Sequence, residues 1–336
     1  MPAIDKLSTG FQKVYPHIVE AKPYPSEVAI LFSKSSIHLS QKSGDFNIPE
    51  VPSQAYTGSF ATFWDNRVQA DFVDEDEVRK GILCNYKVLL APFLYVIDEG
   101  IAEALRKFVA EGGNLIWDAE SGSYNEEMYY YKVPAGGLDQ VMHYQAHMPY
   151  AEEKPRLILN EDYGSLAKGS VLKGYAWWEE IEVLPSGRAI ASFSDGRPAI
   201  VVGQYDKGTT MHVATDIFRA YLFDRSMETR KLIDSFLTKA GVKRPISIAN
   251  ISTNEDDKFE ATFLESEDST ILFLLNSNSV EVLPKIFLNL KEKECGLKEL
   301  ITGQKITSKT EDSKTTFNIK IDPYDVKVIQ VSAKLT

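Results

Sequence analysis

The chain has 336 residues, 43% of them hydrophobic, and carries a net charge of −11 at pH 7. Its length is sufficient for two domains with sizeable cores, and its negative charge argues against nucleic acid and anionic membranes as partners. No apolar run reaches the roughly 18–20 residues that a membrane-spanning helix needs, and the first residues lack the features of a secretory signal. The two cysteines, Cys84 and Cys295, are far apart, and we expect a reduced cytoplasmic location.

An amphipathic helix is predicted near the start of the chain. The stretch "STGFQKVYPHIVEA", residues 8–21, begins with a capping residue and places its apolar side chains on one helical stripe. Pro16 lies inside this pattern, so we expect a kink or a late start of the helix. This helix has no evident partner to pack against, and we assign residues 1–25 to a segment of their own.

Residues 26–244 are predicted to form an α/β domain with a parallel sheet. Buried strands are expected at residues 27–33, 68–73, 86–92 and 114–118. One helix is expected within residues 54–67, and a second follows Asp98 and Glu99, whose charges suit the helix dipole, and stops at Gly112. Strands that alternate with helices favour a parallel sheet with right-handed crossovers.

The alternation of strands and helices is lost further along the chain. Residues 124–149, rich in Tyr, Gly and His, are interpreted as a long excursion. Residues 176–184 and 188–216 predict consecutive strands with hairpin turns at "SDGR" and "YDKG", and residues 225–241 predict an amphipathic closing helix. Short alternating runs without an intervening helix then predict a small antiparallel β-sandwich over residues 245–336.

Candidate ligand-pocket residues lie in the turns after the predicted parallel strands, because open α/β sheets bind ligands at the carboxyl ends of their strands. These candidates are Ser33, Phe93, Asp118, Glu120 and Asp216. Carboxylates that meet at this edge could carry out acid–base chemistry or hold a divalent cation. The same residue types serve as helix caps and turn formers, and we favour that interpretation. No glycine-rich phosphate loop and no nucleophile elbow motif occurs, so no catalytic residue and no cofactor is predicted.

Three further features have simpler explanations than a site. His143 and His147 are spaced for one helical face, but no third ligand is evident, so we predict a surface helix and no metal site. Glu179 and Glu180 lie on a predicted strand and point to opposite faces, and we interpret them as part of a solvated face. Cys84 is interpreted as a small buried hydrophobe.

An aromatic cluster is a candidate for stacking on a sugar ring. Its members are Tyr129, Tyr131, Trp177 and Trp178. The same side chains could form an interface between copies or ordinary core, and we favour the interface.

A series of short motifs runs through the chain in a fixed order. A strand that ends in Ala91-Pro92 is followed by Asp98-Glu99, by "LRKFVAEGG" and by Ser121-Gly122, and later by "WWEEIE" and "STILFLLNSN". Taken together, these segments resemble the trimerisation domain and the C-terminal β-sandwich of glycoside hydrolase family 42, the β-galactosidases. The resemblance covers most of residues 26–335.

This resemblance implies a class I glutamine amidotransferase-like, flavodoxin-like fold for residues 26–244, without that class's catalytic cysteine, and a homotrimer. The family's two catalytic glutamates lie on a (β/α)₈ barrel of roughly 200–250 residues. Only about 25 residues precede the resemblance, so no catalytic residue is carried over to this chain. Residues 8–21 resemble the last helix of such a barrel.

The favoured function is a non-catalytic oligomerisation and accessory part of a β-galactosidase-like glycoside hydrolase. Two alternatives stay open. One is a small-molecule or metal-dependent enzyme that uses a pocket at the carboxyl edge of the sheet. The other is a carbohydrate-binding module for a galactoside-type saccharide. Whether the chain is catalytic by itself is left open.

Overall fold

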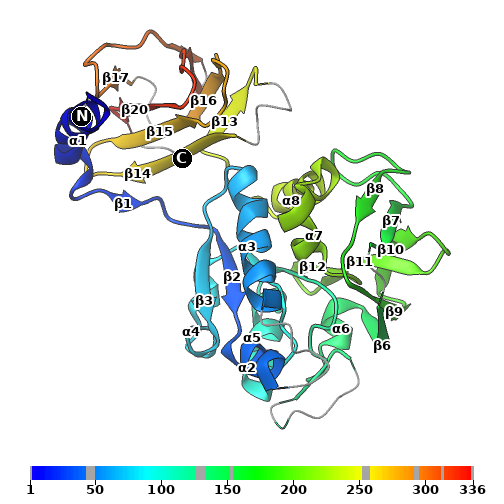
Figure 1. The fold of residues 1–336 in the computed structure, drawn as a ribbon. Coiled ribbons are helices and arrows are strands. Elements are labelled where there is room, and N and C mark those ends of the chain that lie inside the picture. The colour runs from blue at the N-terminus through cyan, green and yellow to red at the C-terminus, as the bar shows by residue number, and fades with distance from the viewer. Residues whose placement is uncertain are drawn as a thin grey trace. The chain divides into compact units, whose positions relative to one another are not determined.

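A computed structural model of the chain describes residues 2–42, 50–125, 127, 133–151, 154–251, 258–290, 295–311 and 314–333. The chain divides into two compact units (Figure 1). Residues 26–242 form one of them, and residues 1–25 together with residues 243–336 form the other. Each unit is described by itself below.

The unit of residues 26–242 is built on a nine-stranded sheet, called the large sheet below. Five neighbouring strands are parallel: β3 (Asp71–Asp74), β2 (Val28–Phe32), β4 (Val88–Ala91), β5 (Asn114–Trp117) and β12 (Gly208–Val213). Four antiparallel strands extend it: β11 (Pro198–Tyr205), β10 (Gly187–Phe193), β7 (Arg156–Leu159) and β8 (Val171–Lys173). The prediction was a parallel sheet in the first part of this unit, followed by strands with hairpin turns over residues 188–216. The observed sheet is mixed, because the two tight hairpins before and after β11 can join only antiparallel neighbours.

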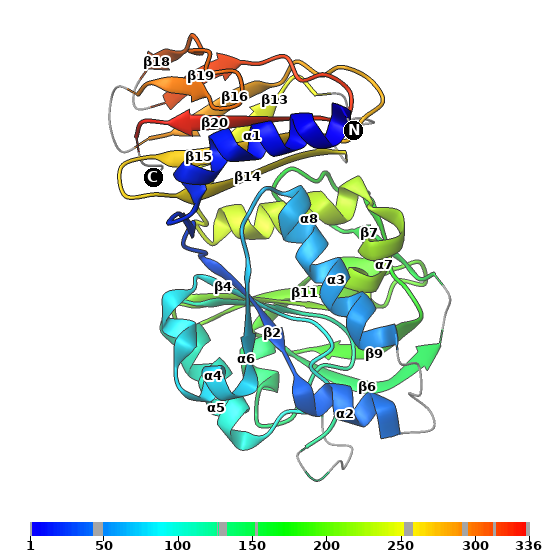
Figure 2. The ribbon, with the colours of Figure 1, turned by 60° about the vertical axis from the view of Figure 1, so that its left-hand side comes forward.

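Helices cover both faces of the large sheet. α3 (Glu50–Asp65), α7 (Ile217–Asp224) and α8 (Met227–Lys239) pack together on one face (Figure 2). On the other side lie α4 (Glu75–Arg79) and α5 (Glu99–Ala110). The remaining short elements are α2 (Lys34–Lys42), η1 (Ile82–Asn85) and α6 (Asp139–Met142). α5 begins where predicted, because the Asp98 side chain accepts a hydrogen bond from the Ile101 N–H at 2.8 Å.

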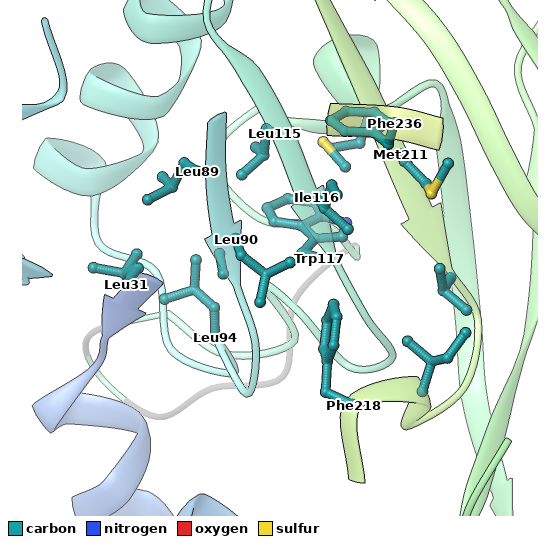
Figure 3. Close-up of a cluster of buried hydrophobic side chains, with 14 of the residues drawn as sticks. Leu31, Leu89, Leu90, Leu94, Leu115, Ile116, Trp117, Met211, Phe218 and Phe236 are labelled. Atoms are coloured by element: carbon teal, nitrogen blue, oxygen red, sulfur yellow. The ribbon is translucent and has the colours of Figure 1, made fainter. Parts of the chain in front are cut away.

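The core of this unit lies between the strands and the helices. Every residue of β4 and β5 is buried, as expected for parallel strands covered on both faces. Figure 3 shows a cluster of these side chains, with Leu89 and Leu90 from β4, Ile116 and Trp117 from β5, and Phe218 from α7. These closely packed strands therefore fix the positions of the turns that follow them.

Part of the predicted excursion is regular structure. β6 (Tyr144–Ala151) pairs with β9 (Trp177–Val183) in a separate two-stranded sheet. The expected strand at 68–73 is the shorter β3, and the closing helix predicted at 225–241 is α8, which Ser226 caps. A single backbone bridge between Trp178 of β9 and Thr215, just after β12, connects β9 to the large sheet.

The other unit contains two antiparallel sheets. One orders β1 (Lys22–Pro23), β14 (Phe259–Glu265), β15 (Thr270–Asn276), β20 (Asp325–Val331) and β17 (Leu297–Glu299). The second orders β13 (Ile246–Ala249), β16 (Lys285–Asn289), β19 (Lys314–Asn318) and β18 (Lys309–Glu311). Phe263 and Leu272 from the first sheet share a core with Ile286 and Phe317 from the second, which is the arrangement of a β-sandwich.

The first helix, α1 (Pro2–Ile18), differs from its prediction in two respects. It begins at Pro2 instead of Ser8, and Pro16 lies in its last turn without ending it. It also has a packing partner, because Val14 is buried against Ile271 and Val328 of the sandwich. Among the described residues, no helix combines the length and the apolar character that a membrane span requires.

Candidate functional site

Buried acidic side chains gather at the carboxyl edge of the parallel strands. Asp118 and Glu120 follow β5, Asp216 follows β12, and Glu179 reaches the same place from β9. Their exposed fractions are 3, 2, 4 and 1% in that order. We call these four residues the carboxylate cluster. The structure thus brings together three of the five predicted pocket residues and adds one acid.

Asp118, Glu179 and Asp216 accept hydrogen bonds within the unit, whereas, in the part of the chain that the structure describes, Glu120 Oε1 and Glu179 Oε2 are buried without a hydrogen-bond partner. The Phe93 N–H donates to Asp118 Oδ1 at 3.3 Å, and the Glu120 N–H donates to Glu179 Oε1 at 2.6 Å. Arg219 Nη1 donates to Asp216 Oδ2 at 2.7 Å, and both side chains are 5% exposed. The first two bonds tie the turn after β5 to the turn after β4 and to strand β9, while the third is local to the start of α7.

Burial changes the titration of the cluster. Burial, reinforced by the charges of Asp216 and Glu179, raises the pKa of Asp118 well above the usual range. Burial, reinforced by repulsion from the neighbouring carboxylates of Glu179 and Asp216, raises the pKa of Glu120 well above its usual range. Burial also raises the pKa of Asp216 to about 6, although Arg219 opposes this increase. Such carboxyl groups retain protons at pH values where exposed ones are ionised.

Glu179 and His212 were missed by the sequence analysis. Glu179 was assigned to a solvated face, which is wrong, because it points into the cluster, where His212 Nε2 lies 3.1 Å from its Oε2. His212 is fully buried and stacks on the Tyr144 ring at 3.7 Å. A signal for Glu179 was present, since the residues two positions away on β9, Trp177 and Ile181, are apolar and share its face.

Phe93 occupies the turn after β4. Its φ of 56° is left-handed, which is uncommon for a residue with a side chain. A sharp turn between a strand and a helix is where a nucleophile elbow exposes its reactive side chain. Here the side chain is an aromatic ring, 3% exposed and 4.3 Å from the Tyr95 ring. The turn therefore has a strained backbone and a buried hydrocarbon side chain.

Ser33 belongs to a different hydrogen-bond group from the cluster. Its Oγ donates to Glu75 Oε1 at 2.8 Å and accepts from the Ser36 N–H at 3.1 Å, while its own N–H donates to the Tyr56 hydroxyl. These bonds place Ser33 at the start of α2 as a capping residue.

Trp177 and Trp178 present little surface to a ligand. Trp178 is 8% exposed, with the Tyr150 ring stacked 4.7 Å away and the Arg197 guanidinium 3.8 Å from its ring. Trp177 is half-buried, and its carbonyl accepts a hydrogen bond from Thr215 Oγ1 at 2.6 Å. Tyr129 and Tyr131 lie outside the described residues.

The predicted surface helix over His143 and His147 is wrong. α6 ends at Met142, His143 is buried with its Nδ1 2.9 Å from Ser186 Oγ, and His147 is exposed on β6.

Cys84 is exposed, not buried, because it lies in η1 ahead of β4. In the part of the chain that the structure describes, no three His, Cys, Asp or Glu side chains are arranged to hold a metal ion.

Comparison with known proteins identifies relatives. A family model described as the β-galactosidase trimerisation domain matches residues 26–243. β-Galactosidase BgaB of Geobacillus sp. (strain Y412MC61) is 27% identical over 292 residues, which cover 80% of this chain and 38% of the relative. β-Galactosidase Pbg of Clostridium perfringens is 25% identical over 290 residues, which cover 81% and 36%. The chain thus spans well under half the length of these relatives.

Solved structures share the fold. The β-galactosidase from Bacillus circulans sp. alkalophilus superimposes with a TM-score of 0.73 at 20% identity, over 96% of this chain and 44% of that one. The α-L-fucosidase isoenzyme 2 from Paenibacillus thiaminolyticus gives a TM-score of 0.68 at 15% identity, over 96% and 51%. At these identities the likeness shows the fold alone.

Proposed function

The chain belongs, through residues 26–243, to the β-galactosidase trimerisation domain family, and we propose that it is the non-catalytic, oligomer-forming part of a β-galactosidase-like glycoside hydrolase. The observation that carries this proposal is the agreement of two boundaries. The family match covers residues 26–243, and the compact α/β unit covers residues 26–242. The match therefore describes a complete folding unit with its own core.

The geometry of the carboxyl edge supports a structural role for this unit. The carboxylate cluster is buried, and three of its members, Asp118, Glu179 and Asp216, accept hydrogen bonds from groups of the same unit. The turn after β4, where an elbow would place its nucleophile, holds Phe93. We infer a class I glutamine amidotransferase-like fold from the order of the parallel strands and the left-handed Phe93, with an aromatic ring at the nucleophile position.

The proposed assembly is a homotrimer of the kind that the family description names. A galactoside-type saccharide would be bound and hydrolysed by residues other than those of the carboxylate cluster. Among the described residues, no disulfide involves Cys84 or Cys295, which fits the reducing cytoplasm that we propose as the location.

The mass of the pure chain in solution tests this function. Light scattering at micromolar concentration should give three times the chain mass of 37.7 kDa. An aryl galactoside should not be hydrolysed by the same sample. A monomer would contradict the assembly role, and rapid hydrolysis would contradict the non-catalytic role.

A further inference from the structure

The two-stranded sheet of β6 and β9 is attached to the large sheet at the middle of β9. We call this two-stranded sheet the ribbon. The Glu179 N–H donates to the Ala214 carbonyl at 3.0 Å, and a backbone bridge joins Trp178 to Thr215. Thr215 Oγ1 also donates to the Trp177 carbonyl at 2.6 Å. The same short stretch of β9 carries the acid that reaches the carboxylate cluster.

The two neighbouring acids of β9 lie in opposite surroundings. Glu179 is 1% exposed, its Oε1 accepts from the Glu120 N–H at 2.6 Å, and its Oε2 lies 3.1 Å from His212 Nε2. Glu180 is half-buried, and its carboxylate accepts from the Tyr150 hydroxyl, which also belongs to the ribbon, at 3.4 Å. Because successive side chains of a strand point to opposite faces, only the charge of Glu179 bears on the contact between ribbon and large sheet.

Charged and titratable groups from several elements face the contact of Glu120 with Glu179. They are Asp118 in the turn after β5, Asp216 after β12, His212 on β12, Arg219 on α7, Tyr95 after β4 and Tyr144 on β6, whose ring stacks on His212. Arg219 and His212 can supply two positive charges against four carboxylates. Complete ionisation therefore leaves a net negative charge inside the unit, where like charges repel strongly.

The hydrogen bonding of the cluster also disfavours ionisation. Among the described residues, Glu120 Oε1, Glu179 Oε2 and Ser121 Oγ are buried without a hydrogen-bond partner. An ionised carboxylate in such a place has lost its hydration without gaining a full set of donors. Lifting the ribbon would return water to these oxygens. The closed arrangement therefore favours protonated acids, and ionised acids favour the open one.

We propose that the carboxylate cluster is a pH-sensitive latch, which holds the ribbon on the large sheet while its acids are protonated and releases the ribbon when they ionise. Burial raises the pKa of Asp118, Glu120 and Asp216 in the closed arrangement. The latch is thus at full strength below the ordinary carboxyl pKa and weakens as pH rises through the raised values. This movement takes place within one chain, so it goes beyond the proposed assembly role.

Hydrogen–deuterium exchange of the full chain, read by mass spectrometry, tests the latch. Protection is the exchange rate of each peptide relative to that of an unstructured peptide at the same pH. Between about pH 5 and about pH 9, protection of β9 should fall about 100-fold more than that of β4 and β5. Asp118 and Glu120 each contribute about tenfold to this fall if their pKa values differ by about one unit between the closed and the open ribbon.

Glu120→Gln should reduce this loss of β9 protection by about tenfold, because glutamine has nearly the same shape and cannot ionise. Glu180→Gln is the matched control, since it makes the same chemical change one residue from Glu179 on the other face of β9. It should retain the full loss. Circular dichroism verifies folding, and Asp118→Asn replaces Glu120→Gln if that chain does not fold.

Three results would overturn the latch. One is an equal loss of protection in β9, β4 and β5, which would indicate unfolding of the whole unit. The second is protection of β9 that does not change with pH. The third is an equal effect of Glu120→Gln and Glu180→Gln, because the position of the charge would then be irrelevant.

Discussion

The Phe93 backbone is left-handed while its ring is buried beside Tyr95 and Tyr56. Removing a buried phenylalanine ring typically costs about 3–5 kcal/mol of unfolding free energy, so Phe93→Ala should destabilise the chain by that amount in urea unfolding. Phe93→Gly loses the same ring but accepts a positive φ without strain. Phe93→Gly should therefore be at least as stable as Phe93→Ala, whereas within a helix glycine is less stabilising than alanine. If Phe93→Ala were clearly more stable than Phe93→Gly, the backbone at position 93 would not be strained.

The carboxylate cluster should make stability depend on pH. The folded-state pKa values of Asp118, Glu120 and Asp216 are raised, so the stability that their protonated forms contribute is fully present below the ordinary carboxyl pKa and is lost as pH rises through the folded-state values. For Asp216 this loss begins near its ordinary pKa of 3.8 and is complete once pH has risen through about 6. Glu120→Gln mimics a protonated acid and should reduce the fall in melting temperature between about pH 5 and about pH 8.

A matched control for this prediction is Asp195→Asn. Arg197 binds this exposed carboxylate and holds its pKa below the usual range, so Asp195 stays ionised throughout that interval. The variant should shift the melting temperature equally at both pH values. An unchanged pH dependence in Glu120→Gln would mean that the cluster is not protonated in the folded state.

The residues of the cluster were only partly predictable. Asp118, Glu120 and Asp216 follow strands that are adjacent in the sheet, and a strand and its following turn can be recognised locally. His212 and Arg219 could not be inferred in the same way, because β12 and α7 join the cluster through tertiary packing. Ser33 was grouped with the acids by its position after β2, yet its hydroxyl bonds to Glu75 instead.

At the scale of elements, α1 shows two different apolar faces. Val14 is 5% exposed and packs on the sandwich, whereas Phe11 is 56% exposed. Val14→Ala should lower the unfolding free energy by about 1–2 kcal/mol, because it leaves a small cavity. Phe11→Ala should change it by less than about 0.5 kcal/mol. Equal effects in urea unfolding would show that α1 does not pack on the sandwich through Val14.

The elements themselves were predictable to different degrees. β2, β4, β5 and α5 were located correctly, since each has a strong local pattern and α5 has a capping aspartate. The mixed extension of the sheet was less evident, because the pairing of β10 with β7 joins strands that a long connection separates. β6 was missed, since its partner β9 lies beyond residue 176 and no local signal reports such pairing.

At the scale of the whole molecule, assembly has to overcome the charge of the chain. Copies that each carry −11 repel one another, but this repulsion acts over long distances and is largely screened at about 0.1 M salt, where the Debye length is roughly 10 Å. Ion pairs between copies would act at contact distance. Ion pairs at contact distance are screened mainly at salt concentrations above about 0.1 M.

The sign of the salt dependence therefore distinguishes the two effects. If ion pairs between copies hold the assembly together, raising salt from about 0.1 M to about 1 M should weaken self-association, because the Debye length falls to roughly 3 Å. Apolar contact opposed by net repulsion would instead strengthen with salt. Sedimentation at the two salt concentrations measures this dependence. Association that tightens in high salt would show that apolar contacts, and not ion pairs between copies, hold the assembly together.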